Sequence, residues 1–337
     1  SKQLNTPKMT NLMIISFLAS IALISHYSQA ELCNPQDKKA LLQIKQAFGN
    51  PYLLASWKND TDCCDWYQVD CDSTTNRITS LTVFSGTISG QLPPAIGDLP
   101  YLQMLDFNHL SDVTGPIQPA ISKLTKLTFL RLKNLALTGS VPAFIGKLTG
   151  LTFLDLSNNK LTGEIPAELS SLSNLQALHL DNNQLSGAIP ASLGNFKGNP
   201  SPDIYLSNND LTGHIPASFA TLKLTSIDLS SNSLVGDASM LFGSSQTTQI
   251  IDISKNKLAF DFSKVVFPSS LTSLDINHND IYGSLPTQLT QLNLQYLNVS
   301  YNSLCGQIPV GGKLQSFETY DYLNNKCLCG SPLASCT

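Results

Sequence analysis

Charged and aromatic residues recur at one position of a nine-residue pattern that is repeated along the chain. The copy at 151–159 reads LTFLDLSNN, and the position lies between its second and third leucines. In chain order it is occupied by Thr82, Asp106, Arg131, Asp155, His179, Tyr205, Asp228, Asp252, Asp275 and Asn298. Apolar residues that alternate with polar ones predict a strand with one buried face, so we expect this row to be exposed. Its carboxylates, imidazole and guanidinium could serve acid–base catalysis, cation binding or recognition of a charged partner.

Catalysis and metal binding are the less favoured uses of this row. Asp155 and His179 occupy adjacent copies and could form a hydrogen-bonded pair, but no serine or cysteine nucleophile stands beside them. A shallow exposed sheet does not exclude water either, so we expect no enzymatic activity. Asp228, Asp252 and Asp275 lack the further oxygen ligands that calcium requires, so we predict neither a metal site nor a cofactor.

Those three aspartates instead favour recognition of a basic partner. They stand on consecutive copies, and neighbouring strands lie about 4.8 Å apart, so their like charges repel one another. A basic partner, or a cation, would relieve that repulsion. The alternative is that each Asp only follows the repeat consensus, in which case the departures from it are more informative: Arg131 with Lys133, His179, Tyr205 and Asp181.

The elements that must position this row are ten copies of the pattern. Successive copies lie 23 to 26 residues apart. The pattern L-x-x-L-x-L-x-x-N-x-L with a period in this range is the signature of leucine-rich repeats. We therefore predict an α/β solenoid, a right-handed superhelix in which each of ten repeats adds one strand to a parallel concave sheet.

Two further features of the repeats predict local structure. A buried amide can satisfy backbone groups of a turn, and an Asn three residues after the strand recurs as Asn159, Asn183, Asn209, Asn232, Asn256, Asn279 and Asn302. Gly86, Leu110 and Leu135 replace it in the first three repeats, where we expect the weakest ladder. The element L-x-G-x-I-P that follows is similar to plant leucine-rich repeats, in which it adds a second short strand. It is disrupted in repeats seven and eight, so we expect an irregular outer face there.

Eight cysteines form two clusters that bracket the repeats. An even count in each cluster suggests two disulfides per cluster in an oxidising compartment, and a bond between adjacent cysteines would be strained. We predict the pairs Cys33–Cys63, Cys64–Cys71, Cys305–Cys327 and Cys329–Cys336. A zinc site is the rival interpretation, but no histidine lies near either cluster. A solenoid needs terminal caps, so we predict an N-terminal cap at 31–75 and a C-terminal cap at 316–337, with repeats at 76–315 between them. A signal peptide at 1–30, or an untranslated leader at 1–8 within it, precedes the first cap.

The first thirty residues predict secretion. Lys2 and Lys8 precede an apolar run at 12–24, and SQA at 28–30 supplies small residues for cleavage. Cleavage leaves 18 of the 20 basic residues against 24 acidic ones, a net charge of −6 that argues against nucleic-acid binding. No second apolar run of about 18 residues occurs, so we expect no membrane anchor. Asn59-Asp-Thr and Asn298-Val-Ser are glycosylation sequons, and a glycan on Asn298 would shield the C-terminal end of the row.

Several stretches outside the repeat pattern are more distinctive. They are ELCNPQDKKALLQIKQAFGNP from 31, DCC at 62–64, GDASMLFG from 236, KNKLAFDFSKV from 255, LCGQIPVGGKLQSF from 304 and NNKCLCGSPLASC from 324. With the ten plant-type repeats, they make the whole mature chain resemble plant polygalacturonase-inhibiting proteins. The resemblance implies a secreted protein of the apoplast or cell wall. Such a protein binds endopolygalacturonases of fungi or insects and blocks their substrate cleft with its concave face.

The resemblance also implies which residues make the contact. The acidic positions that matter in the family correspond here to Asp155, Asp181 and Asp228, and other contact positions correspond to Gln176 and Gln249. Family members also bind de-esterified pectin through basic patches. The row itself completes the predicted contact surface, with Asp106, Arg131, His179, Tyr205, Asp252 and Asp275. We expect Asp155→Lys to weaken inhibition and to leave folding intact, because the position should be exposed.

Two other functions are compatible with the sequence. One is a receptor-like extracellular module that binds a peptide or small ligand. The other is ice binding, which occurs among relatives of this family and needs a flat, regular array of small polar groups. The irregular outer face expected in repeats seven and eight argues against ice binding.

Overall fold

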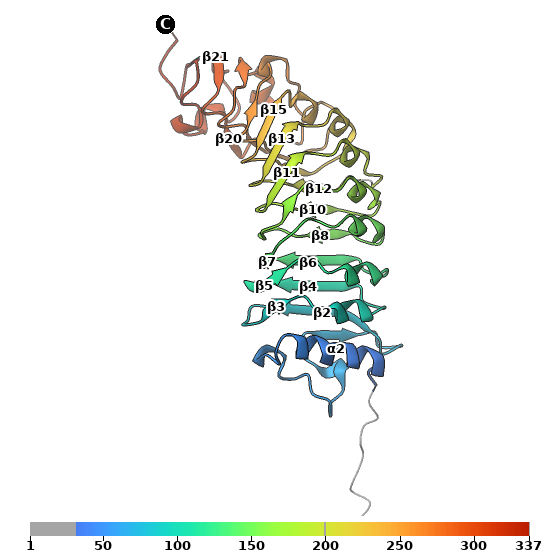
Figure 1. Ribbon diagram of the computed structural model, residues 1–337. Helices are drawn as coiled ribbons and strands as arrows, with labels where there is room; N and C mark the ends of the chain where they lie inside the picture. Colours follow the sequence, from blue (N-terminus) through green and yellow to red (C-terminus); the bar gives the residue numbers. More distant parts are fainter. Residues whose placement is uncertain (1–31, 199, 337) are drawn as a thin grey trace, which may run out of the picture. The chain divides into compact units, whose positions relative to one another are not determined.

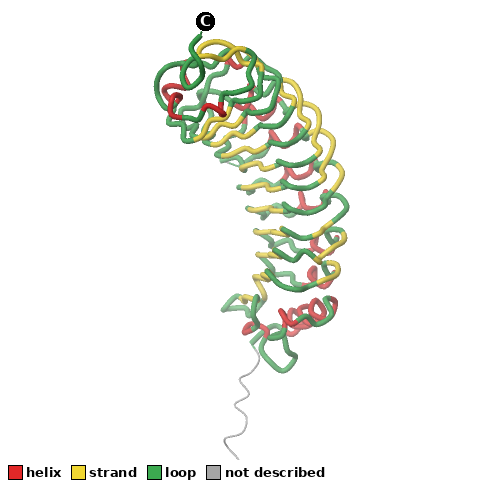
Figure 2. The backbone as a smooth tube through the Cα atoms, turned by 90° about the vertical axis from the view of Figure 1, so that its left-hand side faces the viewer, coloured by secondary structure: helices red, strands yellow, loops and turns green. Residues whose placement is uncertain are grey.

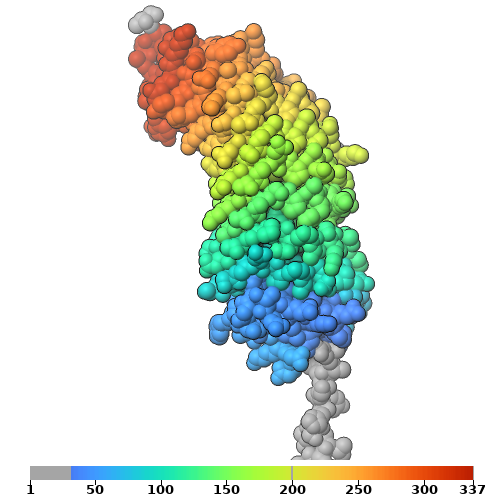
Figure 3. Space-filling view, viewed as in Figure 1, coloured from blue at the N-terminus to red at the C-terminus, as the bar shows by residue number. Residues whose placement is uncertain are grey.

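The computed structural model describes residues 32–198 and 200–336. The predicted signal peptide at 1–30 lies outside the described residues. From residue 33 on, the described residues form one compact unit, a curved stack of coils that runs from the N-terminal cap to the C-terminal cap (Figures 1, 2 and 3). No described helix is long and apolar enough to cross a membrane.

An eleven-stranded sheet runs the length of this unit. Its first strand, β1 (Val69–Cys71), is antiparallel to β2, and all its later pairs are parallel. The ten parallel strands come from the ten predicted repeats, which confirms the fold class, and we call this sheet the concave sheet. They are β2 (Ile78–Phe84), β4 (Met104–Asn108), β6 (Phe129–Lys133), β8 (Phe153–Asp155), β10 (Ala177–His179), β12 (Asp203–Tyr205), β14 (Ser226–Asp228), β16 (Ile250–Asp252), β18 (Ser273–Asp275) and β20 (Tyr296–Asn298).

A second short strand follows in each repeat, as the plant-type element predicts. These strands form three smaller parallel sheets. The first contains β3 (Ser89–Gln91), β5 (Asp112–Gly115) and β7 (Ala136–Leu137). The second contains β9 (Thr162–Gly163), β11 (Gln184–Ala188), β13 (Asp210–His214), β15 (Ser233–Gly236) and β17 (Lys257–Leu258), and the third contains β19 (Tyr282–Gly283), β21 (Ser303–Gln307) and β22 (Cys327–Cys329).

Short 3-10 helices complete the coils. In most repeats they have five residues: η3 (Pro94–Asp98), η4 (Pro119–Lys123), η5 (Ala143–Lys147), η6 (Ala167–Ser171), η7 (Ala191–Asn195), η8 (Ala217–Thr221) and η11 (Thr287–Gln291). In repeats seven and eight, η9 (Ser239–Leu241) and η10 (Phe262–Lys264) have only three, and the second sheet ends at β17. The expected irregularity is confirmed. Packed phenylalanines fill this region, namely Phe242, Phe260, Phe262 and Phe267.

The asparagine ladder joins each repeat to the one before it. Asn183 Nδ2 donates to the carbonyls of Leu156 and Leu180, each at 3.1 Å, and its Oδ1 accepts from the Leu161 backbone at 3.0 Å. The other predicted asparagines make equivalent bonds, which confirms their structural role. The sequence interpretation missed an eighth, Asn325, which bonds Val299 and Leu304 in the same way.

Both ends of the stack are capped and held by disulfides. At the N-terminus, α2 (Pro35–Ala47), η1 (Tyr52–Leu54) and η2 (Cys63–Asp65) cover the first repeat. At the C-terminus, η12 (Leu314–Ser316) and η13 (Thr319–Asp321) precede β22. All four predicted disulfide pairs are present.

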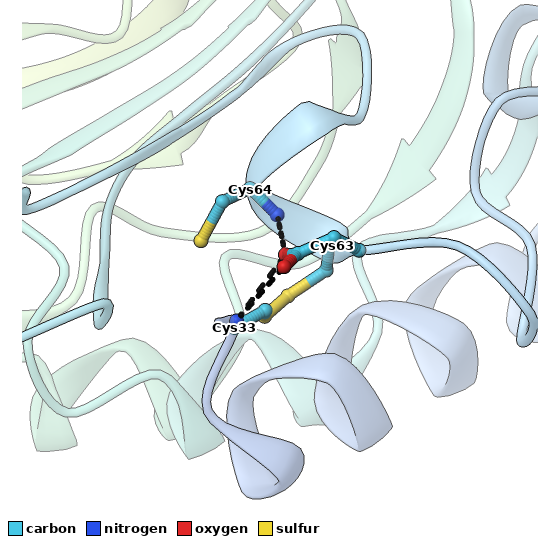
Figure 4. Close-up of side chains that lie close together, drawn as sticks. Cys33, Cys63 and Cys64 are labelled. Carbon is cyan, nitrogen blue, oxygen red and sulfur yellow. Dashed lines mark hydrogen bonds between the residues drawn. A yellow bond between two sulfur atoms is a disulfide. The ribbon is translucent and has the colours of Figure 1, made fainter. Parts of the chain in front are cut away.

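The N-terminal cysteines come close enough to suggest a metal site, but their chemistry is different. Cys33, Cys63 and Cys64 lie around Asp62 (Figure 4). All three cysteines are in disulfides, so they offer no thiolate to zinc. The Asp62 carboxylate instead accepts from the backbone N–H groups of Cys33 and Cys64, at 3.2 and 2.9 Å.

Candidate functional site

The row of central strand residues forms one physical stripe across the concave sheet. Strand pairing aligns each member with the next, from Thr82 beside Asp106 through to Asp275 beside Asn298. The alignment predicted from the repeat spacing is therefore confirmed. The degree of exposure along the stripe is not what the alternation predicted.

Asp106 and Asp155 are buried rather than exposed, with relative accessibilities of 4% and 3%. Long basic side chains from the next or preceding strand lie against them. Arg131 donates from Nε to Asp106 Oδ1 at 2.9 Å and from a terminal nitrogen to Oδ2, and Lys133 Nζ lies 3.5 Å from Asp155 Oδ2. The prediction that Asp155 is exposed, and that Asp155→Lys would leave folding intact on that ground, is wrong.

The hydrogen-bonded pair considered between Asp155 and His179 is not formed. Asp155 Oδ1 accepts from both the backbone N–H and the hydroxyl of Ser157, at 3.0 and 2.6 Å. His179 Nδ1 lies 3.7 Å from Asp181 Oδ1 instead. A carboxylate committed to a turn and to Lys133 is not placed to orient an imidazole, so the arrangement offers no catalytic dyad.

The bond to the residue two positions later recurs along the stripe. Asp228 accepts from Ser230, Asp252 from Ser254, Asp275 from Asn277 and Asn298 from Ser300, always through Oδ1 to the backbone N–H. Each such bond stabilises the turn that ends the strand. The sequence signal was the repeated D-x-S, which our sequence interpretation did not use. It shows that the consensus aspartates have a structural function.

The aspartates at the C-terminal end of the stripe, unlike Asp106 and Asp155, have no basic side chain bound to them in the part of the chain that the structure describes. No described Lys or Arg forms an ion pair with Asp228, Asp252 or Asp275. Burial, followed by the charges of its two neighbours, raises the pKa of Asp252 to about 6. Burial also raises the pKa of Asp275, whose Oδ2 accepts from the Tyr296 hydroxyl at 2.9 Å. Three carboxylates without an ion pair among the described residues are therefore concentrated in repeats seven to nine, and Lys255 is the basic residue that acts on Asp275 from a greater distance.

Aromatic side chains dominate the middle of the concave sheet. Phe129, Phe153, His179 and Tyr205 come from four consecutive strands and form two stacked pairs that are joined by a tilted contact between Phe153 and His179. The sequence analysis selected His179 and Tyr205 but missed the two phenylalanines. They stand two residues before Arg131 and Asp155, so the same alternation that defined the row places them on its face.

The remaining candidate residues lie near the edges of this face. Gln176 and Gln249 are exposed and each directly precedes its strand, at β10 and β16. Asp181 is half-buried and accepts from the Asn182 side chain at 2.8 Å. Asn59 is exposed in a turn of the N-terminal cap, whereas Asn298 is half-buried within β20.

The parallel concave sheet, the asparagine ladder and the disulfide-bonded caps define a leucine-rich-repeat protein. Family comparisons agree. Residues 34–72 match the "Leucine rich repeat N-terminal domain" and residues 77–198 match the "Leucine-rich repeat region". Single "Leucine Rich Repeat" units match at 203–222, 270–292 and 293–312.

Among curated proteins, the chain is similar to "Polygalacturonase inhibitor" of Pyrus communis, with 68% identity over 91% of this chain and 93% of the relative. It is 65% identical to "Polygalacturonase inhibitor 1" of Arabidopsis thaliana, again over 91% of this chain and 93% of the relative. The chain belongs to the polygalacturonase inhibitor family of leucine-rich-repeat proteins. These relatives are named as inhibitors, and such proteins are non-enzymatic, so the prediction that this protein is not an enzyme is confirmed.

A solved structure with a different printed function is also similar. The crystal structure of a plant ice-binding protein superposes with a TM-score of 0.89 at 52% identity, covering 91% of this chain and 99% of that chain. The fold alone therefore does not distinguish inhibition from ice binding.

Proposed function

We propose that this protein is secreted to the apoplast or cell wall and inhibits endopolygalacturonases of fungi or insects. The observation that carries the proposal is the identity of about two thirds with named polygalacturonase inhibitors over nearly the whole mature chain. The concave sheet is the binding surface. It occupies the substrate cleft of the enzyme and so keeps pectin out.

The electrostatics of the concave sheet support this proposal. A cleft that binds the polyanion pectin is lined by basic residues, and an acidic surface complements it. The acidic surface that remains available is Asp228, Asp252 and Asp275, since Asp106 and Asp155 are already paired with basic side chains. We therefore place the electrostatic centre of the proposed contact surface in repeats seven to nine, rather than along the whole row that the sequence suggested.

De-esterified pectin is a second proposed ligand, with Arg131 and Lys133 as its basic contacts. Both side chains lie against carboxylates of the stripe, so pectin must compete with Asp106 and Asp155 for them. Competition of this kind makes pectin binding at this place weak.

The test is the rate of pectate cleavage by a panel of fungal and insect endopolygalacturonases with and without the purified, secreted protein. We expect saturable inhibition of at least one enzyme, weakened as salt rises from roughly 0.05 to 0.3 M, because screening reduces attraction between opposite charges. Asp228→Asn should weaken the inhibition several-fold, with Asp98→Asn as the control, an exposed aspartate at the end of η3 that pairs with Lys123 away from the stripe. Protein that is folded by circular dichroism and inhibits no enzyme in the panel would overturn the proposal.

Ice binding is the second candidate, favoured by the similarity to the ice-binding structure. It requires a flat and regular surface, whereas η9 and η10 are shortened in repeats seven and eight and the second sheet ends after repeat eight, at β17. A thermal-hysteresis measurement on the same sample distinguishes the two, since only an ice-binding protein depresses the freezing point without lowering the melting point. A receptor-like role would instead require capture of a membrane co-receptor in a pull-down experiment.

A further inference from the structure

Four aromatic rings form a continuous stack across repeats three to six. Phe129 and Phe153 have ring centroids 4.6 Å apart and planes 7° from parallel. Phe153 and His179 are 5.4 Å apart with planes tilted by 42°, and His179 and Tyr205 are 4.3 Å apart at 7°. We call these four residues the ring ladder. All four are half-buried, so part of each ring reaches the surface of the concave sheet.

The residues between the rings explain the path of the ladder. Phe129 and Phe153 are paired in register, but the next residue in their line is Ala177 and the one after it is Asp203. The small Ala177 side chain leaves room beside Phe153. The next ring in the ladder is therefore His179, two residues further along β10, and it is followed by Tyr205 in the central row. The 42° tilt occurs where the ladder passes from the phenylalanine positions to the central row.

Two carboxylates beside the phenylalanines of the ring ladder are paired with basic side chains. Asp106 is paired with Arg131, and Asp155 with Lys133, on the strands that carry the two phenylalanines or adjoin them. Tyr205 adjoins Asp228, where the acidic residues without an ion pair among the described residues begin. The concave sheet therefore has an aromatic part, which begins among paired charges, and an acidic part that is directly continuous with it.

Stacking prepares these rings for a contact. Side chains that are held in one orientation before binding lose little conformational entropy when a partner covers them. Half-buried aromatic side chains also contribute a large contact area, and such residues dominate measured binding energies at protein interfaces. Paired charges nearby attract a charged partner less strongly, so the ring ladder suits an apolar, uncharged segment.

Resting on the proposed inhibition, we infer that the ring ladder anchors the enzyme by contacting an apolar segment beside its basic cleft. The acidic residues Asp228, Asp252 and Asp275 contact the basic cleft itself. Because short-range apolar contacts act after encounter and charges act before it, the ring ladder controls the dissociation rate and the acidic part controls the association rate.

The experiment is surface plasmon resonance between the full secreted protein and an endopolygalacturonase that it inhibits, at roughly 0.05 and 0.3 M salt. The ladder variants are Phe153→Leu and Tyr205→Leu, which keep an apolar side chain and remove the ring. Tyr301→Leu is the control, because Tyr301 also stacks on a histidine, His278 at 4.0 Å, but in the bends that follow β20 and β18, outside the ladder. Asp228→Asn reports on the acidic part. Each variant is first compared with the wild type by circular dichroism and thermal unfolding.

We expect each ladder variant to raise the dissociation rate about tenfold, with an association rate within about twofold of wild type at both salt concentrations. Tyr301→Leu should bind as wild type, and Asp228→Asn should lower the association rate mainly at low salt. Folded ladder variants that dissociate as slowly as the wild type would overturn the ladder inference and leave the proposed inhibition standing. A wild-type protein that binds no polygalacturonase of the panel would overturn both.

Discussion

The aspartates of the stripe differ in what their two carboxylate oxygens do. In Asp155, one oxygen accepts from Ser157 and the other lies near Lys133, so the whole group is engaged and buried. In Asp228, Oδ1 accepts from Ser230, and no described residue donates to Oδ2. The same consensus residue is thus a structural group in repeat four and an available charge in repeat seven.

Removal of the Asp155 carboxylate should reduce stability more than removal of the Asp228 carboxylate. Asp155→Ala leaves the buried Ser157 hydroxyl and Lys133 without their acceptor, and we expect a loss of about 2 to 3 kcal/mol in the free energy of unfolding. Asp228→Ala, the matched control, should lose about 1 kcal/mol, because Ser230, which donates to Asp228, is nearer to water than Ser157 is. Urea unfolding measures both. Equal losses would show that Lys133 and burial contribute nothing at Asp155.

The raised pKa of Asp252 makes stability depend on pH in a defined direction. The pKa is about 6 in the folded chain, against an ordinary value of 3.8, because burial and the adjacent carboxylates disfavour the charged form. The folded state therefore holds this proton more tightly, and the associated stability is complete below pH 3.8 and lost as pH rises to about 6.

Asp252→Asn should remove that dependence, because an amide does not titrate and its oxygen still accepts from Ser254. Relative to wild type, the variant should gain on the order of 1 to 3 kcal/mol between pH 4 and pH 7. Denaturant unfolding at the two pH values measures the difference. A difference between variant and wild type that stays constant with pH would contradict the raised pKa.

At the scale of structural elements, the asparagine ladder and the strands act as one unit. Asn209, which is buried, donates to the carbonyls of Leu180, Leu206 and Ser207 and accepts from the Leu185 backbone. A single amide thus satisfies four backbone groups that the turn leaves without a strand partner. The ladder therefore fixes the bend between the concave sheet and the second strands.

Asn209→Ala should be among the more damaging single substitutions in the repeats. It leaves several buried backbone groups without partners, and we expect a loss of about 3 kcal/mol or more in the free energy of unfolding. Asn174→Ala, which removes one exposed bond to Thr149, is the matched control and should cost below about 1 kcal/mol. A thermal melt of both variants makes the comparison. Similar melting temperatures would show that water replaces the amide.

Sequence alone predicted the elements better than the surface. A period of 23 to 26 residues fixes the number of coils, and the alternation in each strand fixes which residues share a face. Neither pattern shows which residues a long side chain on a neighbouring strand will contact. The burial of Asp106 and Asp155 depends on Arg131 and Lys133 from adjacent strands, and the stacking of Phe153 on His179 depends on the small Ala177. Such contacts between repeats can be predicted only when the strand register and the side-chain rotamers are known.

For the whole molecule, the caps determine whether the stack holds together. A solenoid exposes the cores of its end repeats, and here each end is closed by two disulfides. The bonds differ in the length of chain that they close, with a separation of 30 residues for Cys33–Cys63 and 7 for Cys329–Cys336. The N-terminal cap also has a buried ion pair, in which Arg77 donates to Asp37 at 2.7 and 2.8 Å.

Removing the longer crosslink should destabilise the protein more. Loop-closure entropy predicts a loss of about 3 to 4 kcal/mol for Cys33→Ser with Cys63→Ser, and about 2 kcal/mol for Cys329→Ser with Cys336→Ser. Guanidinium unfolding of the two double variants measures this order. A larger loss of stability for the C-terminal double variant would contradict this explanation, in which the bonds act by restricting the unfolded chain.

The bonds of the asparagine ladder have a consequence for how such a face can change. Each ladder amide contacts only its own repeat and the one before it, as Asn183 does with Leu156 and Leu161. The ladder bonds of a coil that carries this asparagine are therefore the same whichever such coil precedes it. Recombination between related genes could exchange one coil, or add one, without disturbing the rest of the stack. The partner would then meet an altered surface on a scaffold that still folds.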